Sequence, residues 1–159
     1  MRKRKIWDQD DEHVQASIGS IYYTRTIGAA KPANVASMLA NLDNFVREST
    51  APVGYILHLG AQSIPPEGAD RPKVWEMFNK NAKNLAGVAI VIDAEGFKGS
   101  MIRSTVTMAF SIYRRGYESS TFDDLISAAN WLSPRVNMTQ SELVSFAGDT
   151  AATLLKKRF

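Results

Sequence analysis

The stretch "VAIVIDAEGFKGSM", residues 88–101, decides the fold. Five apolar residues lead into Asp93, and a small cluster that ends in Gly99 and Ser100 follows. A strand that is apolar at every position is typical of the parallel sheets of α/β proteins, where helices cover both faces. We therefore predict a central strand over residues 88–92 and a largely buried helix that begins after Ser100.

The flanking sequence supplies further strands and helices. Residues 13–27 alternate on both sides of Gly19-Ser20, which predicts a β-hairpin, although "KIWD" could supply an earlier strand instead. An apolar strand is expected over 55–59. Apolar residues at three- and four-residue spacings predict one helix from Pro32 and another from Pro72 to a glycine stop at Gly87.

The C-terminal third carries a short strand in "YESSTF" and two predicted capping boxes. Thr121 with Asp124 would open one helix, which Pro134 ends, and Thr139 with Glu142 would open the last. The order predicts a single α/β domain with a four- or five-stranded, mostly parallel mixed sheet, flanking helices and an extra C-terminal helix. We assign three regions: an N-terminal segment or edge strand, the α/β domain and a packed amphipathic helix, at 1–12, 13–135 and 139–158.

Composition excludes several classes of function. The 159 residues include no cysteine and only two histidines, His13 and His58, so we expect no disulfide, no metal site and no cofactor. The net charge of +3 is modest, and the short basic runs at the two ends are not expected to bind nucleic acid. The apolar run 85–92 is far shorter than the roughly 20 residues of a membrane span. The acidic residues after the first basic run argue against a secretion signal, so we expect a cytoplasmic protein.

The glycine cluster after the central strand lacks the spacing of a P-loop, since Lys98 precedes Gly99 instead of following it. Gly99 and Ser100 could still hold a lone anion at a helix N-terminus or could simply cap the helix. Asp93 stands at a strand end, where it either caps a turn or acts with Glu95 as an acid/base pair. The turn-capping interpretation is the stronger one.

His58 lies within the apolar strand "YILHLG" and falls on the same face as Ile56. This setting favours a partly buried, hydrogen-bonded histidine over a general base. Trp75 and Trp131 each fall in a predicted helix, where packing is the usual role of tryptophan.

Together, the leading strand pair, the α/β alternation, "VAIVIDAEGF" and "STFDDLISAANWL" resemble the STAS superfamily of sulfate transporter and anti-sigma factor antagonist domains, in particular its bacterial STAS/SEC14-like branch. The resemblance covers about residues 13–135. It implies a non-enzymatic regulatory or scaffolding protein that binds an unidentified protein partner, with a homodimer as one option. A binding domain for a small anion, nucleotide or lipid stays open as the alternative, and an enzyme using Asp93 or His58 is the third interpretation.

In anti-sigma factor antagonists, a serine in the loop after the third strand is phosphorylated and switches partner binding. The resemblance gives Ser63 this place in "LGAQSIPPEGADR". The loop departs from the family's Asp-Ser-Gly pattern, because Gln62 precedes Ser63 and Ile64 follows it. An ordinary loop serine is the alternative interpretation.

The partner is expected at the carboxyl ends of the parallel strands, the usual functional edge of an open α/β sheet. Two loops meet there, at residues 60–71 and 93–100. Phe97 is either an exposed apolar anchor for a partner or folded back over its own sheet. The predicted partner-binding residues are Gln62, Ser63, Ile64, Glu67, Asp93, Glu95, Phe97 and Lys98.

Overall fold

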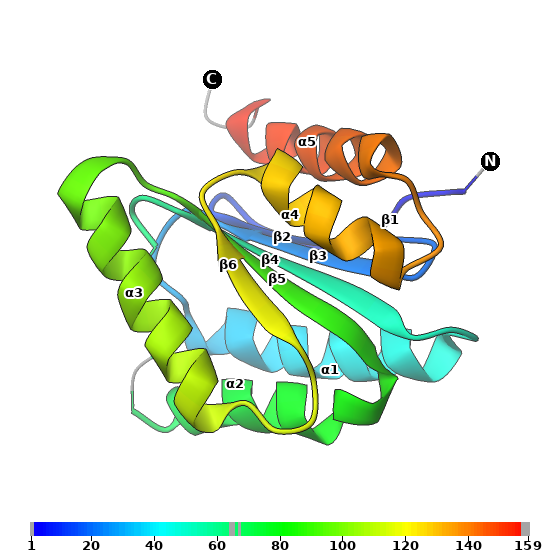
Figure 1. The fold of residues 1–159 in the computed structure, drawn as a ribbon, viewed down its shortest axis with the longest axis horizontal. Coiled ribbons are helices and arrows are strands. Elements are labelled where there is room, and N and C mark those ends of the chain that lie inside the picture. The colour runs from blue at the N-terminus through cyan, green and yellow to red at the C-terminus, as the bar shows by residue number, and fades with distance from the viewer. Residues whose placement is uncertain (1, 64–65, 67, 157–159) are drawn as a thin grey trace.

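A computed structural model describes residues 2–63, 66 and 68–156. Within this part of the chain, six strands form one sheet between two layers of helices (Figure 1). Helices α1 (Pro32–Glu48) and α2 (Asp70–Lys80) cover one face of the sheet. Helices α4 (Leu125–Leu132) and α5 (Gln140–Lys156) cover the other.

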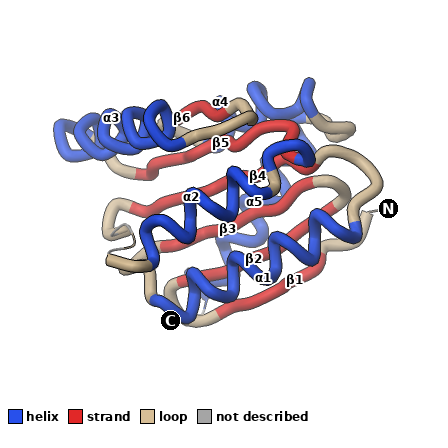
Figure 2. The backbone as a smooth tube through the Cα atoms, turned by 90° about the horizontal axis from the view of Figure 1, so that it is seen from below, coloured by secondary structure: helices blue, strands red, loops and turns tan. Residues whose placement is uncertain are grey.

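The sheet order follows the chain from one edge to the other, and only its first two pairings are antiparallel. The other three pairings are parallel, with a helix in each connection (Figure 2). Gly19 lies in the turn between residues 13–18 and 21–26, the second antiparallel pair, with φ of +54°, a conformation that glycine adopts readily. The strands are β1 (Lys5–Gln9), β2 (His13–Ile18), β3 (Ile21–Thr26), β4 (Val53–Gly60), β5 (Leu85–Asp93) and β6 (Ser119–Phe122).

Alternation along the strands divides the core into two apolar clusters. The cluster beneath α1 and α2 contains Tyr22, Tyr55, Phe78, Val88, Ile90 and Ile92. The cluster beneath α4 and α5 contains Tyr23, Ile56, Ala89, Val91, Leu132, Leu143 and Phe146. β5 is buried on both faces, as its continuous apolar sequence predicts.

The predicted α/β class, hairpin and parallel strands are confirmed, but the predicted strand count is wrong. Residues 5–9 form β1 in addition to the hairpin, so the sheet has six strands. The glycine stop at Gly87 is also wrong, because α2 ends at Lys80 and Gly87 lies inside β5. A side chain at Gly87 would come within 2.9 Å of the Trp131 ring, so glycine there permits close packing of α4 on the sheet.

One of the two predicted capping boxes is present. The Thr139 N–H donates to Glu142 Oε2 at 2.8 Å, and the Glu142 N–H donates to Thr139 Oγ1 at 3.2 Å. Thr121 lies in β6 and caps no helix. Asp124 is itself the N-cap of α4, accepting from the Ser127 N–H at 2.8 Å.

Helix α3 (Gly96–Tyr113) differs most from its prediction. It begins at Gly96 and not after Ser100, and only Gly99 and Phe110 are buried among its residues. Its inner side lies on β5 and β6, and Trp75 of α2 packs against Phe110 with ring centroids 4.8 Å apart. Its outer side faces solvent, so the prediction of a largely buried helix is wrong.

Candidate functional site

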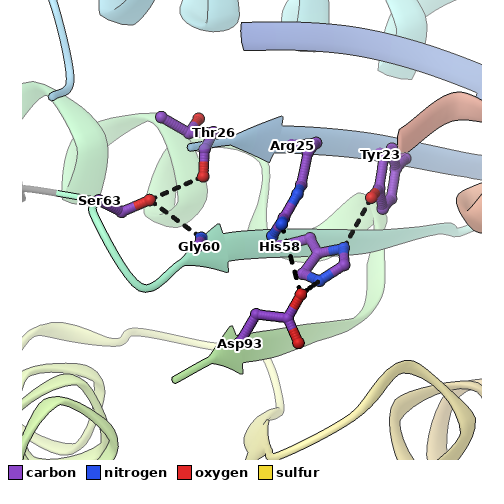
Figure 3. A network of polar contacts seen from close by, with 7 residues as sticks. All are labelled: Tyr23, Arg25, Thr26, His58, Gly60, Ser63 and Asp93. Carbon is purple, nitrogen blue, oxygen red and sulfur yellow. Dashed lines mark hydrogen bonds and ion pairs between the residues drawn. The ribbon is translucent and has the colours of Figure 1, made fainter. Parts of the chain in front are cut away.

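The carboxyl ends of β3, β4 and β5 meet at one edge of the sheet, as the parallel pairing requires. Arg25 lies opposite His58, and Gly60 lies opposite Asp93. Because side chains alternate along a strand, Tyr23, Arg25, His58 and Asp93 all project to the face that α4 and α5 cover. Figure 3 shows these four side chains directed toward one another.

A chain of polar contacts joins these side chains. His58 Nδ1 lies 2.7 Å from the Tyr23 hydroxyl, and His58 Nε2 lies 3.2 Å from Asp93 Oδ2. Arg25 Nη2 donates to the same carboxylate oxygen at 3.3 Å. His58 is only 6% exposed, whereas the Asp93 side chain is 51% exposed and forms the solvent side of this network.

Burial, followed by the nearby Arg25 charge, lowers the pKa of His58 to about 4, against the opposing effect of Asp93. The imidazole is therefore neutral at pH 7. In the tautomer that fits both contacts, Nδ1 accepts from the Tyr23 hydroxyl and Nε2 donates to Asp93. Both ring nitrogens of His58 then take part in hydrogen bonds, and its partner Tyr23 is fully buried. These contacts support the prediction that His58 is a buried, hydrogen-bonded histidine.

Arg25 holds Asp93 with one terminal nitrogen only. Its other terminal nitrogen, Nη1, is buried and makes no hydrogen bond to the described residues. Neither Arg25 nor Tyr23 is among the residues predicted from the sequence. Arg25 lies opposite His58, and Tyr23 lies two residues earlier in β3. Both positions follow only from the parallel register of β3 and β4.

Ser63 ties the loop after β4 to two strand ends. Its hydroxyl accepts from the Gly60 N–H at 3.0 Å and donates to the Thr26 carbonyl at 2.7 Å (Figure 3). A phosphate on this oxygen would remove the donor to Thr26 and add negative charge at the edge that carries Asp93. Ser63 therefore has a defined structural role in the unmodified chain.

The remaining predicted partner-binding residues are either exposed or outside the described residues. Gln62, Glu95 and Lys98 are exposed, and Phe97 is 85% exposed, so Phe97 does not fold back over the sheet. No hydrogen bond within the described part of the chain joins Asp93 to Glu95, which stands at the N-cap of α3. Ile64 and Glu67 lie outside the described residues.

The predicted anion site at Gly99 and Ser100 does not lie at the start of α3, where the prediction placed it. Since α3 begins at Gly96, both residues lie within its first turn and a half. The Gly99 N–H already donates to the Glu95 carbonyl at 3.3 Å. A Cβ at Gly99 would clash with the Ala94 carbonyl, so this glycine permits close backbone packing instead of leaving an open amide.

An exposed apolar surface on α3 is a further feature that was not predicted from the sequence. Met101, Met108 and Ile112 are each more than half exposed, and Phe97 begins the same row. We call these four residues the α3 stripe. Their spacing of four and seven residues can be read from the sequence, but the prediction of a largely buried helix left no exposed apolar row on α3.

Two hollows on the surface of the described residues lie away from the carboxyl ends of β3, β4 and β5. One of about 490 Å³ is lined by Arg2, Lys5, Trp7 and the hairpin turn, and one of about 190 Å³ lies between α3 and β6. Among the described residues, no group of three or more His, Cys, Asp or Glu side chains could hold a metal ion. No helix in the same part of the chain combines the length and apolar character that crossing a membrane requires.

Comparison with known proteins supports the fold. A solved structure of an uncharacterized protein from the DUF3478 family with a SpoIIAA-like fold, from Shewanella loihica PV-4, is similar to this chain with a TM-score of 0.52. The two chains are 13% identical, and the match covers 83% of this chain and 95% of the other. No protein-family model and no curated protein matches the chain. The chain therefore has a STAS-like α/β fold.

Proposed function

We propose that this chain is a non-enzymatic, cytoplasmic regulatory or scaffolding protein of the STAS-like kind, which acts by binding another protein. Its membership of the bacterial STAS/SEC14-like branch is part of the proposal and rests on the "STFDDLISAANWL" pattern. The partner would bind where the carboxyl edge of the sheet meets α3.

One observation carries this proposal: Phe97 stands 85% exposed at that edge, and Met101 follows one turn later. Large apolar side chains that face water next to polar residues are typical of protein contact sites. Burying the Phe97 side chain in a partner would contribute on the order of 2 kcal/mol. Both ring nitrogens of His58 are engaged, which adds support for a binding role over catalysis.

The test is a pull-down from the native host followed by mass spectrometry, with three forms of the chain. We expect the unmodified chain to capture a protein and Phe97→Ser with Met101→Ser to lose it. The matched control is Ile126→Ser, which removes an exposed apolar side chain of α4 on the opposite layer of the molecule. Melting temperatures of all three forms should nearly agree, because none of these side chains is buried.

Two results would count against the proposal. Capture that survives loss of Phe97 and Met101 would place the contact elsewhere. A large fall in melting temperature with capture intact would assign both side chains to the core.

A further inference from the structure

The α3 stripe is symmetric about the middle of its helix. α3 runs over 18 residues, Gly96–Tyr113, and its midpoint falls between Ser104 and Thr105. Phe97 and Ile112 are equally distant from that midpoint, and so are Met101 and Met108. The pattern therefore reads nearly the same in either chain direction, with large apolar residues toward both ends and small ones in the centre.

The stripe lies opposite the side of α3 that packs on the sheet. At 100° per residue, Phe97, Met101, Ser104, Thr105, Met108 and Ile112 fall within about 50° of one direction. Gly99 and Phe110, the buried residues of α3, point the other way. No large side chain of the stripe is therefore needed to attach α3 to its own sheet.

We propose that the α3 stripe binds a second copy of this chain as an antiparallel helix pair, with the twofold axis between Ser104 and Thr105. A twofold interface requires a surface that is complementary to itself, which the stripe provides. Phe97 then meets Ile112 of the second copy, and Met101 meets its Met108. This inference rests on the proposed function, because it names the occupant of the same surface.

The residues at the axis allow the two helices to approach closely. Ser104 and Thr105 are small, and the Thr105 hydroxyl donates to the Met101 carbonyl of its own helix at 2.9 Å. Contact at the axis therefore leaves that hydroxyl satisfied. Helices pack with their axes about 8–10 Å apart, and the shorter distances need small side chains at the crossing point.

The helix dipoles favour an antiparallel over a parallel pair, because the positive N-terminus of each helix then lies beside the negative C-terminus of the other. Glu95 precedes α3, and Arg114 and Arg115 follow it, so the antiparallel pair also brings Glu95 near two arginines of the second copy. Lys98, in the first turn of α3, lies near the same arginines and offsets part of this attraction. The two Lys98 residues would lie about 20 Å apart along the helices, beyond the roughly 8 Å screening length of physiological salt.

The size of the contact predicts a weak, reversible dimer. Two helices of 18 residues touch along about 27 Å and across about 10 Å. Such a contact covers about 270 Å² on each copy, well below the roughly 800 Å² per partner of a standard interface, so assembly is weak and transient. The mass in solution should therefore rise with concentration from that of one 17.6 kDa chain toward that of two.

Cysteine cross-linking tests both the contact and its direction, since the chain has no cysteine of its own. We expect Ser104→Cys to form a disulfide-linked dimer on mild oxidation, because the axis brings this position close to its own copy. Met101→Cys is the matched control, an exposed stripe residue about one turn earlier. In the antiparallel pair its two copies lie about 10 Å apart along the helices, too far for a disulfide, whereas in a parallel pair they would face each other.

Each other cross-linking result would overturn the proposal. Equal cross-linking of the two variants would indicate a parallel pair or random collision, and no cross-linking of either would indicate that the stripes do not meet. As a second measurement, Met101→Glu should leave the melting temperature unchanged, and its mass in solution should stay that of one chain at every concentration. The control Ile126→Glu should still dimerise. A dimer that survives Met101→Glu would place the interface elsewhere.

The two proposals fail separately. If the unmodified chain stays monomeric but captures a protein that the variant with Phe97→Ser and Met101→Ser loses, the proposed function is supported and the dimer is contradicted. A chain that neither dimerises nor binds a protein through α3 contradicts both.

Discussion

Helices α3 and α5 are nearly equal in length, 18 and 17 residues, yet they use their apolar residues differently. α5 buries a row of apolar residues against β2 and α4, namely Leu143, Phe146, Ala147 and Leu154. α3 buries little besides Phe110 and turns Phe97, Met101, Met108 and Ile112 to solvent. The apolar residues of α5 hold the fold together, whereas those of the α3 stripe are available to a partner.

The largest expected effect is a difference in the free energy of unfolding between a truncation in α5 and one in α3. Phe146→Ala should lower the free energy of unfolding by about 3–5 kcal/mol, because the ring is buried against Tyr23 and its loss leaves a cavity. Met108→Ala on the α3 stripe should change it by no more than about 0.5 kcal/mol. Urea unfolding monitored by circular dichroism measures both values, and similar losses for the two variants would contradict the division between the helices.

Acid should have the next largest effect on the stability of the fold, and it should act on the side of the sheet that α5 covers. His58 lies on that side and is hydrogen-bonded there to Tyr23. Its folded pKa of about 4 is below its ordinary value of 6.5. As pH falls through this window, the unfolded chain takes up a proton that the folded chain does not. Stability is therefore full above about pH 6.5 and falls by up to about 3 kcal/mol toward pH 4.

The variant His58→Gln isolates this contribution in a series of unfolding curves from pH 7 to pH 4. Burial also lowers the pKa of His13, so part of the acid sensitivity should remain in the variant. The slope of stability against pH should be smaller in His58→Gln than in the unmodified chain. Identical slopes would show that His58 is not held neutral in the fold.

Much of the fold follows from local sequence. The Gly19-Ser20 hairpin, the apolar strand before Asp93 and the Thr139–Glu142 capping box each depend on neighbouring residues, and the structure contains all three. The burial of His58 followed from its place in an apolar strand. These features could be predicted because each depends on strand alternation, turn geometry or capping alone.

The candidate site was less predictable because it depends on which element covers which. α3 carries apolar residues on two sides, at Phe110 and at Met108, and periodicity cannot tell which side meets the sheet. Arg25 and Tyr23 reach His58 only through the register of two parallel strands. Gly87 resembled a helix stop because its role, making room for Trp131, involves a distant helix.

The most direct test of the central claim is methionine oxidation by dilute peroxide, followed by mass spectrometry, over a series of chain concentrations. The chain contains its own controls, because Met101 and Met108 lie on the α3 stripe while Met38, Met77 and Met138 are buried. In dilute solution we expect the two stripe methionines to be oxidised much faster than the three buried ones. Their oxidation should slow together as the concentration rises and a second copy covers them.

Stripe methionines that are oxidised as slowly as Met77 even in the most dilute sample would show that α3 is covered within one chain. Rapid oxidation of Met101 and Met108 at every concentration would show that no second copy binds there. Either result would contradict the account, and fast oxidation that becomes slow with concentration is the result it requires.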